Sequence, residues 1–169
     1  MIKKIVTIGV YGFDKEHFFK AIVDAGVDTF CDVRARRGVR GSEYTFANSE
    51  RLQESLHELG IRYIHMKDLA PSQATRDAQQ REDEKHGGKR KRTALGETFI
   101  REYEQECLAH FDSAQFVERV GPEAHVVCLM CVEGEPQACH RSLLAQRLAH
   151  DVAVPVENLT PSMVSSKKK

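Results

Sequence analysis

Short apolar segments alternate with amphipathic segments along most of this chain. The apolar segments cover residues 4–10, 28–33, 61–66, 124–131 and 152–156. They are rich in β-branched residues, which favour strands. Strands that are apolar throughout are typical of a parallel sheet buried on both faces, and alternation with helices requires crossovers over those faces. The sequence therefore predicts an α/β fold, a single three-layer domain with a mostly parallel sheet of about five strands flanked by helices.

The segments between the strands carry helix boundary residues. Asp14 is a predicted N-cap of a helix that ends near Gly26, and Asn48 or Ser49 begins a second helix that ends at Gly60. Further helices are predicted at residues 95–110, 113–120 and 139–150.

A charged stretch interrupts this pattern. Residues 73–93 are almost all polar and include Gly87, Gly88 and a run of four basic residues. They lack apolar side chains whose burial would offset an ordering entropy of roughly 1–2 kcal/mol per residue. We expect a mobile, partly helical excursion from a single domain that spans residues 1–160, followed by a polar basic tail over residues 161–169.

The composition excludes several classes of protein. Hydrophobic residues make up 41% of the 169 residues and charged residues 30%, as in a soluble globular protein. Lys+Arg and Asp+Glu are both 25, which argues against a uniformly basic nucleic-acid binder. No apolar run approaches the roughly 20 residues of a membrane span, and five cysteines, an odd number, suggest reduced thiols. We expect a cytoplasmic protein with no membrane partner.

One stretch concentrates reactive groups. The fourth apolar segment ends in Cys131, a polar loop holds Glu133, and the motif Cys139-His140-Arg141 opens the next predicted helix. A helix N-terminus presents unpaired N–H groups and a partial positive charge. Histidine and arginine at that position favour an anion site.

Other polar residues follow the remaining predicted strands. Tyr11 follows the first strand, Asp32 and Arg34 close the second, and His65 closes the third. In an open parallel sheet the carboxyl ends of the strands share one edge, where ligands bind at the switch point. We therefore expect these residues and Cys131 to form one site.

Sequence motifs in the same order through most of the chain carry a family resemblance. These motifs are Thr7-Ile8-Gly9, Asp32-Val33-Arg34, Phe46, Gly60-Ile61-x-Tyr63-x-His65, Leu129-Met130-Cys131-x-Glu133 and Cys139-His140-Arg141. The chain resembles the family catalogued as domain of unknown function 488. Because no activity is established for that family, the resemblance implies only the fold and the location of the site.

Chemical type suggests the role of each candidate residue. The predicted catalytic residues are Asp32, Cys131, Glu133 and His140, and the predicted substrate-binding residues are Tyr11, Arg34, His65, Cys139 and Arg141. Arginine and histidine would hold an anion, a carboxylate would act as acid or base, and the thiols would line the pocket. The function predicted is an enzyme-like pocket for an anionic, nucleotide-like or nucleic-acid-derived ligand.

The cysteines admit two other interpretations. Cys131 resembles the strand-end nucleophile of rhodaneses and cysteine phosphatases, although Arg141 is too distant for their compact cradle and Glu133 opposes thiolate formation. Cys131 and Cys139 could instead bind metal with His140 and Glu133, and His65 would have to complete the site from another strand. The spacing Cys-x7-Cys is unlike the short hairpins of structural zinc sites, so we predict no metal-ligand set and no stoichiometric structural zinc. The residues do not identify a cofactor.

Competing functional classes remain open. A non-catalytic module could bind nucleic acid through Lys89, Arg90, Lys91 and Arg92. A small metal-binding or redox protein is a third class. In the simplest structural interpretation, Asp32–Arg34 is an ion pair and the other residues only pack.

The charged excursion can be tested by limited proteolysis. Trypsin should cut the native protein first between Arg76 and Arg92, because an unpacked segment enters a protease more readily than a packed one. Mass spectrometry of the first fragments locates the cut. Protection of this segment would mean that it docks on the domain.

Overall fold

The computed structural model describes residues 1–85, 87, 95–133 and 139–161. At its centre lies a five-stranded, all-parallel sheet in the order β3-β2-β4-β1-β5. The strands are β1 (Lys4–Ile8), β2 (Thr29–Asp32), β3 (Arg62–His65), β4 (Val126–Met130) and β5 (Val156–Leu159). The predicted single-domain α/β fold is confirmed.

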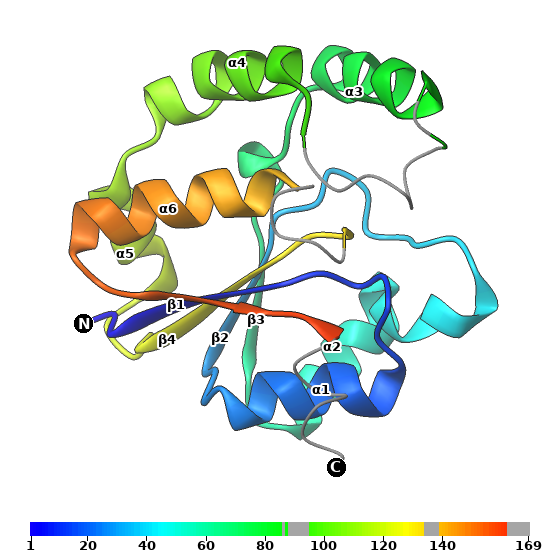
Figure 1. Cartoon of the computed structure of the whole chain (residues 1–169). Coiled ribbons are helices and arrows are strands. Elements are labelled where there is room, and N and C mark those ends of the chain that lie inside the picture. Colours follow the sequence, from blue (N-terminus) through cyan, green and yellow to red (C-terminus); the bar gives the residue numbers. More distant parts are fainter. Residues whose placement is uncertain (86, 88–94, 134–138, 162–169) are drawn as a thin grey trace.

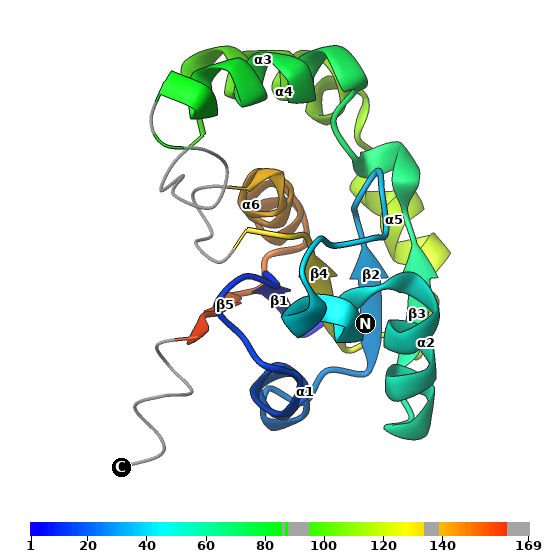
Figure 2. The same ribbon diagram turned by 90° about the vertical axis from the view of Figure 1, so that its right-hand side faces the viewer.

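Helices cover both faces of the sheet (Figures 1 and 2). On one face lie α1 (Lys15–Asp24) and α2 (Ser49–Glu58), and on the other lie α5 (Ser113–Val120) and α6 (His140–Val152). The pair α3 (Gln73–Lys85) and α4 (Glu97–Glu106) lies beyond α6. Short 3₁₀ helices cover Ser42–Ala47, Lys67–Leu69 and Leu108–His110.

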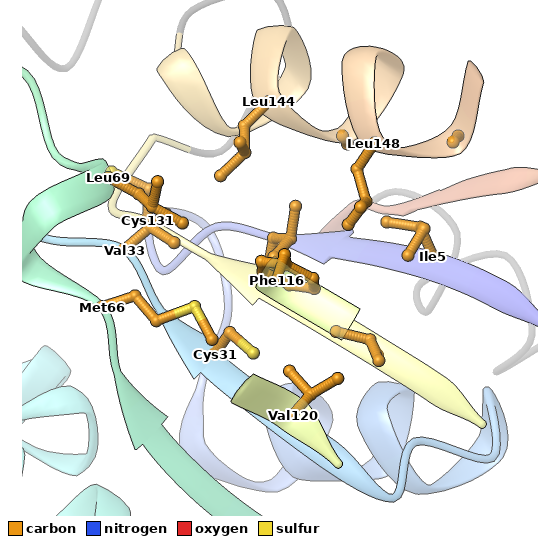
Figure 3. Packing of buried hydrophobic residues seen from close by; sticks show 14 of the residues in the cluster. Ile5, Cys31, Val33, Met66, Leu69, Phe116, Val120, Cys131, Leu144 and Leu148 are labelled. Carbon is orange, nitrogen blue, oxygen red and sulfur yellow. The ribbon is translucent and has the colours of Figure 1, made fainter. Parts of the chain in front are cut away.

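The sheet separates two apolar clusters, and β4 contributes to both. Val127 and Leu129 pack toward α5 and α6, whereas Cys128 and Met130 pack toward α1 and α2. Figure 3 shows the first cluster, with Leu144 of α6 above the sheet. This alternation follows from the two-residue period of a strand, and it explains why every residue of this segment is apolar.

The strand order makes β4 the turning point of the topology. β4 pairs with β1 on one side and with β2 on the other. The chain leaves β1 and β2 toward α1 and α2, but it leaves β4 toward α6 on the opposite face (Figure 2). The connections therefore diverge on both sides of the carboxyl end of β4, the arrangement at which open α/β sheets bind ligands.

Helix boundaries follow the predicted signals in part. Asp14 caps α1, and its carboxylate accepts the His17 N–H at 2.8 Å. Asn48 is the N-cap residue of α2, but its side chain instead accepts the Val39 N–H at 2.8 Å and fixes the preceding loop.

The last predicted strand, 152–156, was wrong in position. Helix α6 continues to Val152 and ends at Ala153, whose φ of 56° is left-handed. β5 therefore starts at Val156. The first strand is shorter than the predicted 4–10, because Val10 and Tyr11 donate their N–H groups to the Val132 carbonyl and leave the ladder.

The charged stretch begins with helix α3, in agreement with the prediction that it is partly helical. α3 packs on α4, and the Gln79 side chain accepts the Gly96 N–H at 2.9 Å. Thr75, Gln79 and Asp83 are buried along this helix. The basic run 89–92 and most of the predicted tail lie outside the described residues, and mobility of the stretch stays a prediction. Among the residues that the structure describes, no helix combines the length and apolar character needed to cross a membrane.

Two leucines, one in α2 and one just after it, test the packing of this fold. Leu56 is fully buried, whereas Leu59, which follows the helix, is 45% exposed. Leu56→Ala should lower the free energy of unfolding by about 2–5 kcal/mol, because it removes buried apolar contacts and leaves a cavity. Leu59→Ala, the matched control, should change it by less than about 0.5 kcal/mol. Urea unfolding measures both, and equal effects would contradict the packing described.

Candidate functional site

The strand register brings the predicted site residues to one edge of the sheet. Met130 pairs with Ile8 of β1 and with Asp32 of β2. Gly9, Asp32 and Cys131 therefore lie at or just beyond the carboxyl ends of three adjacent strands. The strands that lead to Asp32 and Cys131, β2 and β4, are parallel neighbours.

Two cysteines and one histidine form a buried cluster there. Nδ1 of His140 lies 3.6 Å from Sγ of Cys131 and 3.7 Å from Sγ of Cys139. The three atoms all lie within 4.8 Å of one another, and neither cysteine forms a disulfide. Figure 3 shows Cys131 at the end of β4, next to Val33 and Leu69.

A backbone hydrogen bond orients the histidine. Nε2 of His140 lies 2.9 Å from the Val33 carbonyl oxygen. Because a carbonyl only accepts, Nε2 carries the hydrogen. In the neutral tautomer that this bond selects, the lone pair is on Nδ1, which faces the two sulfurs. The ring also packs against buried Tyr103 of α4, with ring centroids 5.3 Å apart.

The local backbone explains how neighbouring residues converge on one point. Cys139 is the N-cap residue of α6 and has an extended backbone, with φ −140° and ψ 147°. His140 is the first helical residue. The change from extended to helical backbone turns both side chains toward Cys131, which a continuous helix or strand would not allow for adjacent residues.

The cysteines differ in acidity. Burial opposes ionisation of Cys139, but its hydrogen bond with Cys131 and the adjacent His140 and Arg141 hold the pKa of its thiol well below the ordinary value. Burial raises the pKa of Cys31 to about 12 and that of Cys128 well above its ordinary value. Sequence reasoning placed the reactive thiol at Cys131 and gave Cys139 a lining role, whereas the lowered pKa is that of Cys139.

A second polar group surrounds Asp32. The Arg34 guanidinium donates two hydrogen bonds of 2.8 Å to its carboxylate, and the Tyr63 hydroxyl donates a third at 2.6 Å. Partial burial and this bond raise the pKa of Tyr63 to about 12. The His65 ring lies 2.9 Å from the Arg34 carbonyl oxygen. Nη1 of Arg34 is buried and has no hydrogen-bond partner among the described residues.

The two groups lie on different sides of the end of β2. Tyr63 stacks on Phe30 and packs with the cluster beneath α1 and α2. Val33 belongs with Cys131 and Cys139 to the cluster beneath α6. The groups are linked by the backbone at residues 33 and 34, whose carbonyls contact His140 and His65. A single ligand shared by both groups stays a prediction.

Arg141 supports the loop that follows β4. Its Nη1 donates to the Glu133 carbonyl oxygen. Both residues are buried. The loop lies so close to β1 that a Cβ atom on Gly9 would overlap the Glu133 carbonyl and lie 2.7 Å from Nη1 of Arg141. The Tyr11 ring packs on Tyr44 with centroids 5.3 Å apart.

Sequence reasoning missed several contributors to this edge. Gly9 and Tyr63 lie in the motifs of the family resemblance, so the sequence marked them without giving them a role. No sequence pattern indicated Tyr103, because α4 is distant from the site in the sequence and only the folded chain brings this ring against His140. The Val33 contribution is a backbone carbonyl, which no side-chain pattern reveals.

A separate groove lies elsewhere, between α3 and the start of α4. Its volume is about 540 Å³, and Gln79, Lys85 and Phe99 are among its lining residues. No predicted site residue lines it. Its polar, mixed-charge lining gives it no clear relation to the cluster at β4.

The fold and this edge define a class of protein, an open α/β sheet with a buried cysteine–histidine cluster at the switch point beside its central strand. Comparison with known protein families identifies the family. The chain belongs to the family described as domain of unknown function DUF488, whose model matches residues 14–148. The predicted family is confirmed. No curated protein and no solved structure matched the chain.

Gly9→Ala tests the close approach of the two loops. The added methyl group should displace the Glu133 carbonyl and lower the free energy of unfolding by about 1–3 kcal/mol, as overpacking does. Gly38→Ala is the control, since its Cβ would lie 4.0 Å from the nearest atom, Oδ1 of Asn48. Denaturant unfolding compares the two variants. If Gly9→Ala left the free energy of unfolding unchanged, the loop after β1 and the loop after β4 would have to lie further apart than the structure shows.

Proposed function

We propose that this protein is an enzyme that binds a small anionic, nucleotide-like ligand at the carboxyl end of β4. The supporting observation is the concentration of buried ionisable side chains at one edge of the sheet. Of the ten polar or charged residues that are buried in the described part of the chain, half gather there, namely Asp32, Arg34, Glu133, His140 and Arg141. Buried charge opposes folding unless it is paired, so its concentration at a ligand-binding topology favours function over stability.

The arginines supply the argument for an anion. Guanidinium groups match carboxylates and phosphates in shape and remain charged when buried. Arg34 is 1% exposed, its Nε and Nη2 are occupied by Asp32, and its Nη1 has no hydrogen-bond partner among the described residues. A buried donor without a partner costs about 1–3 kcal/mol. An anion that accepts from Nη1 would recover that free energy.

The proposed roles follow from chemistry and position. Arg34 and Arg141 bind the anion, with Tyr11 and His65 at the rim of the site. His140 was predicted to share this role, but its Nε2 is engaged by the Val33 carbonyl and its Nδ1 faces the sulfurs. Asp32 or Glu133 transfers protons, and the Cys131–Cys139 pair lines the reactive centre. The hydrogen bond from Arg141 to the Glu133 carbonyl makes Arg141 a brace of the loop as well, so Arg34 is the sharper probe of binding.

Thermal shift with simple anions tests the proposal. Phosphate, sulfate and adenosine monophosphate, compared with chloride at equal ionic strength, should include at least one ligand that raises the melting temperature. Arg34→Lys keeps the charge but removes the planar donor set. Loss of a charge-assisted bond of about 1.5–3 kcal/mol should weaken binding by about 10–100-fold.

The matched control is Arg147→Lys. Arg147 lies on α6 and pairs with Asp151 at 3.0 Å, away from the edge of the sheet. This variant should keep the anion affinity of the wild type. The proposal fails if no anion stabilises the wild type, or if folded Arg34→Lys binds the anion as tightly as Arg147→Lys does.

A further inference from the structure

We propose that Cys131, Cys139 and His140 bind one zinc ion, with the fourth position open to water or to a ligand. This inference deepens the proposed function, because it gives the chemical nature of the reactive centre. The argument uses the geometry of the three ligand atoms, the orientation of His140 and the surroundings of the cluster.

The distances match a tetrahedral zinc site. Zinc binds cysteine sulfur at about 2.3 Å and histidine nitrogen at about 2.0–2.1 Å, so tetrahedral angles place sulfur and nitrogen about 3.6 Å apart. Nδ1 of His140 lies 3.6 Å from Sγ of Cys131 and 3.7 Å from Sγ of Cys139. The two sulfurs are within 4.8 Å of each other, a limit that includes the tetrahedral separation of about 3.8 Å.

The histidine is oriented as a ligand. Its Nε2 is held by the Val33 carbonyl oxygen at 2.9 Å, which leaves Nδ1 directed toward the sulfurs. Metal-binding histidines generally donate their other ring N–H to a carbonyl or carboxylate, which fixes the tautomer and the ring plane. A buried imidazole N–H needs an acceptor in any case. The feature that favours a ligand is therefore Nδ1, which faces both sulfurs.

The ligand set selects the metal class and the type of site. Two thiolates and an imidazole suit zinc and exclude calcium and magnesium, which need oxygen ligands. Within the described part of the chain, no other Cys, His, Asp or Glu side chain joins the group. Three protein ligands are typical of catalytic zinc, whereas structural zinc uses four.

This inference revises the metal-free interpretation of the sequence. The spacing argument compared Cys-x7-Cys with structural hairpins and required His65 to complete the site from another strand. His65 instead contacts the Arg34 carbonyl, and His140 supplies the third ligand. Two apolar clusters hold the fold together, and that no zinc is structural stays a prediction. Chelation should remove the metal and leave the far-ultraviolet circular dichroism unchanged.

Cobalt(II) titration of the reduced, chelator-treated full chain tests the site. Tetrahedral thiolate–cobalt gives intense visible bands and a near-ultraviolet charge-transfer band, and zinc should displace it at one equivalent per chain. Cys131→Ser and Cys139→Ser should each weaken the charge-transfer band. Cys107→Ser is the control, since Cys107 lies at the end of α4 and outside the cluster.

A histidine variant keeps the test decisive if the cysteine variants unfold. His140→Gln retains a donor in the place of Nε2 for the Val33 carbonyl but removes the Nδ1 ligand. It should weaken cobalt binding by more than about 100-fold, since loss of a mere hydrogen-bond partner of a ligand already costs about 10–100-fold. The inference is overturned if the folded wild type gives no thiolate–cobalt bands, or if His140→Gln binds cobalt as the wild type does.

The two proposals fail separately. Metal uptake without any anion-dependent stabilisation overturns only the anion site. Anion binding that depends on Arg34, in a protein that binds no cobalt, overturns only the metal centre.

Discussion

The insertion of β4 between β1 and β2 is the constraint on which the rest of the structure depends. Its parallel ladders to both neighbours bury the strand on every side, so its residues must be apolar and must serve two clusters at once. Because β4 alone among these three connects to the opposite face, the chain after Met130 must cross the sheet edge. That crossing places Cys131 and the start of α6 at one point.

The crossing also explains why polar groups are buried at this edge, although their desolvation opposes folding. Backbone groups beyond the strands leave the ladder, and each needs a partner when buried. The Val132 carbonyl accepts two N–H groups from the β1 loop, and the Glu133 carbonyl accepts from Arg141. Part of the buried charge therefore supports the loop, and Gly9 is needed because nothing larger fits between the loops. Loop support does not require a Cys–Cys–His cluster, so the metal inference does not depend on the residues that support the loop.

Much of the fold was predictable from the sequence, and the reasons are local. Apolar strands, the Asp14 cap and the positions of most helices depend on short-range patterns that survive in the folded protein. The error at the last strand arose where two β-branched residues, Val152 and Val154, flank a left-handed Ala153 that no pattern marks. The strand order, which decides the neighbours of β4, depends on long-range packing and could only be partly anticipated.

The candidate site shows why the spacing of cysteines in the sequence does not predict metal ligands reliably. Counting seven residues between Cys131 and Cys139 assumes that ligands come from one regular hairpin, as in structural zinc motifs. Here one ligand ends a strand, and two adjacent residues straddle the boundary between extended and helical backbone. The Val33 carbonyl, which sets the tautomer of His140, directly follows the neighbouring strand β2 and lies 107 residues from His140 in the sequence. Sequence spacing is therefore a weak guide wherever a site spans a parallel sheet edge, because each strand contributes independently through the register of its ladder.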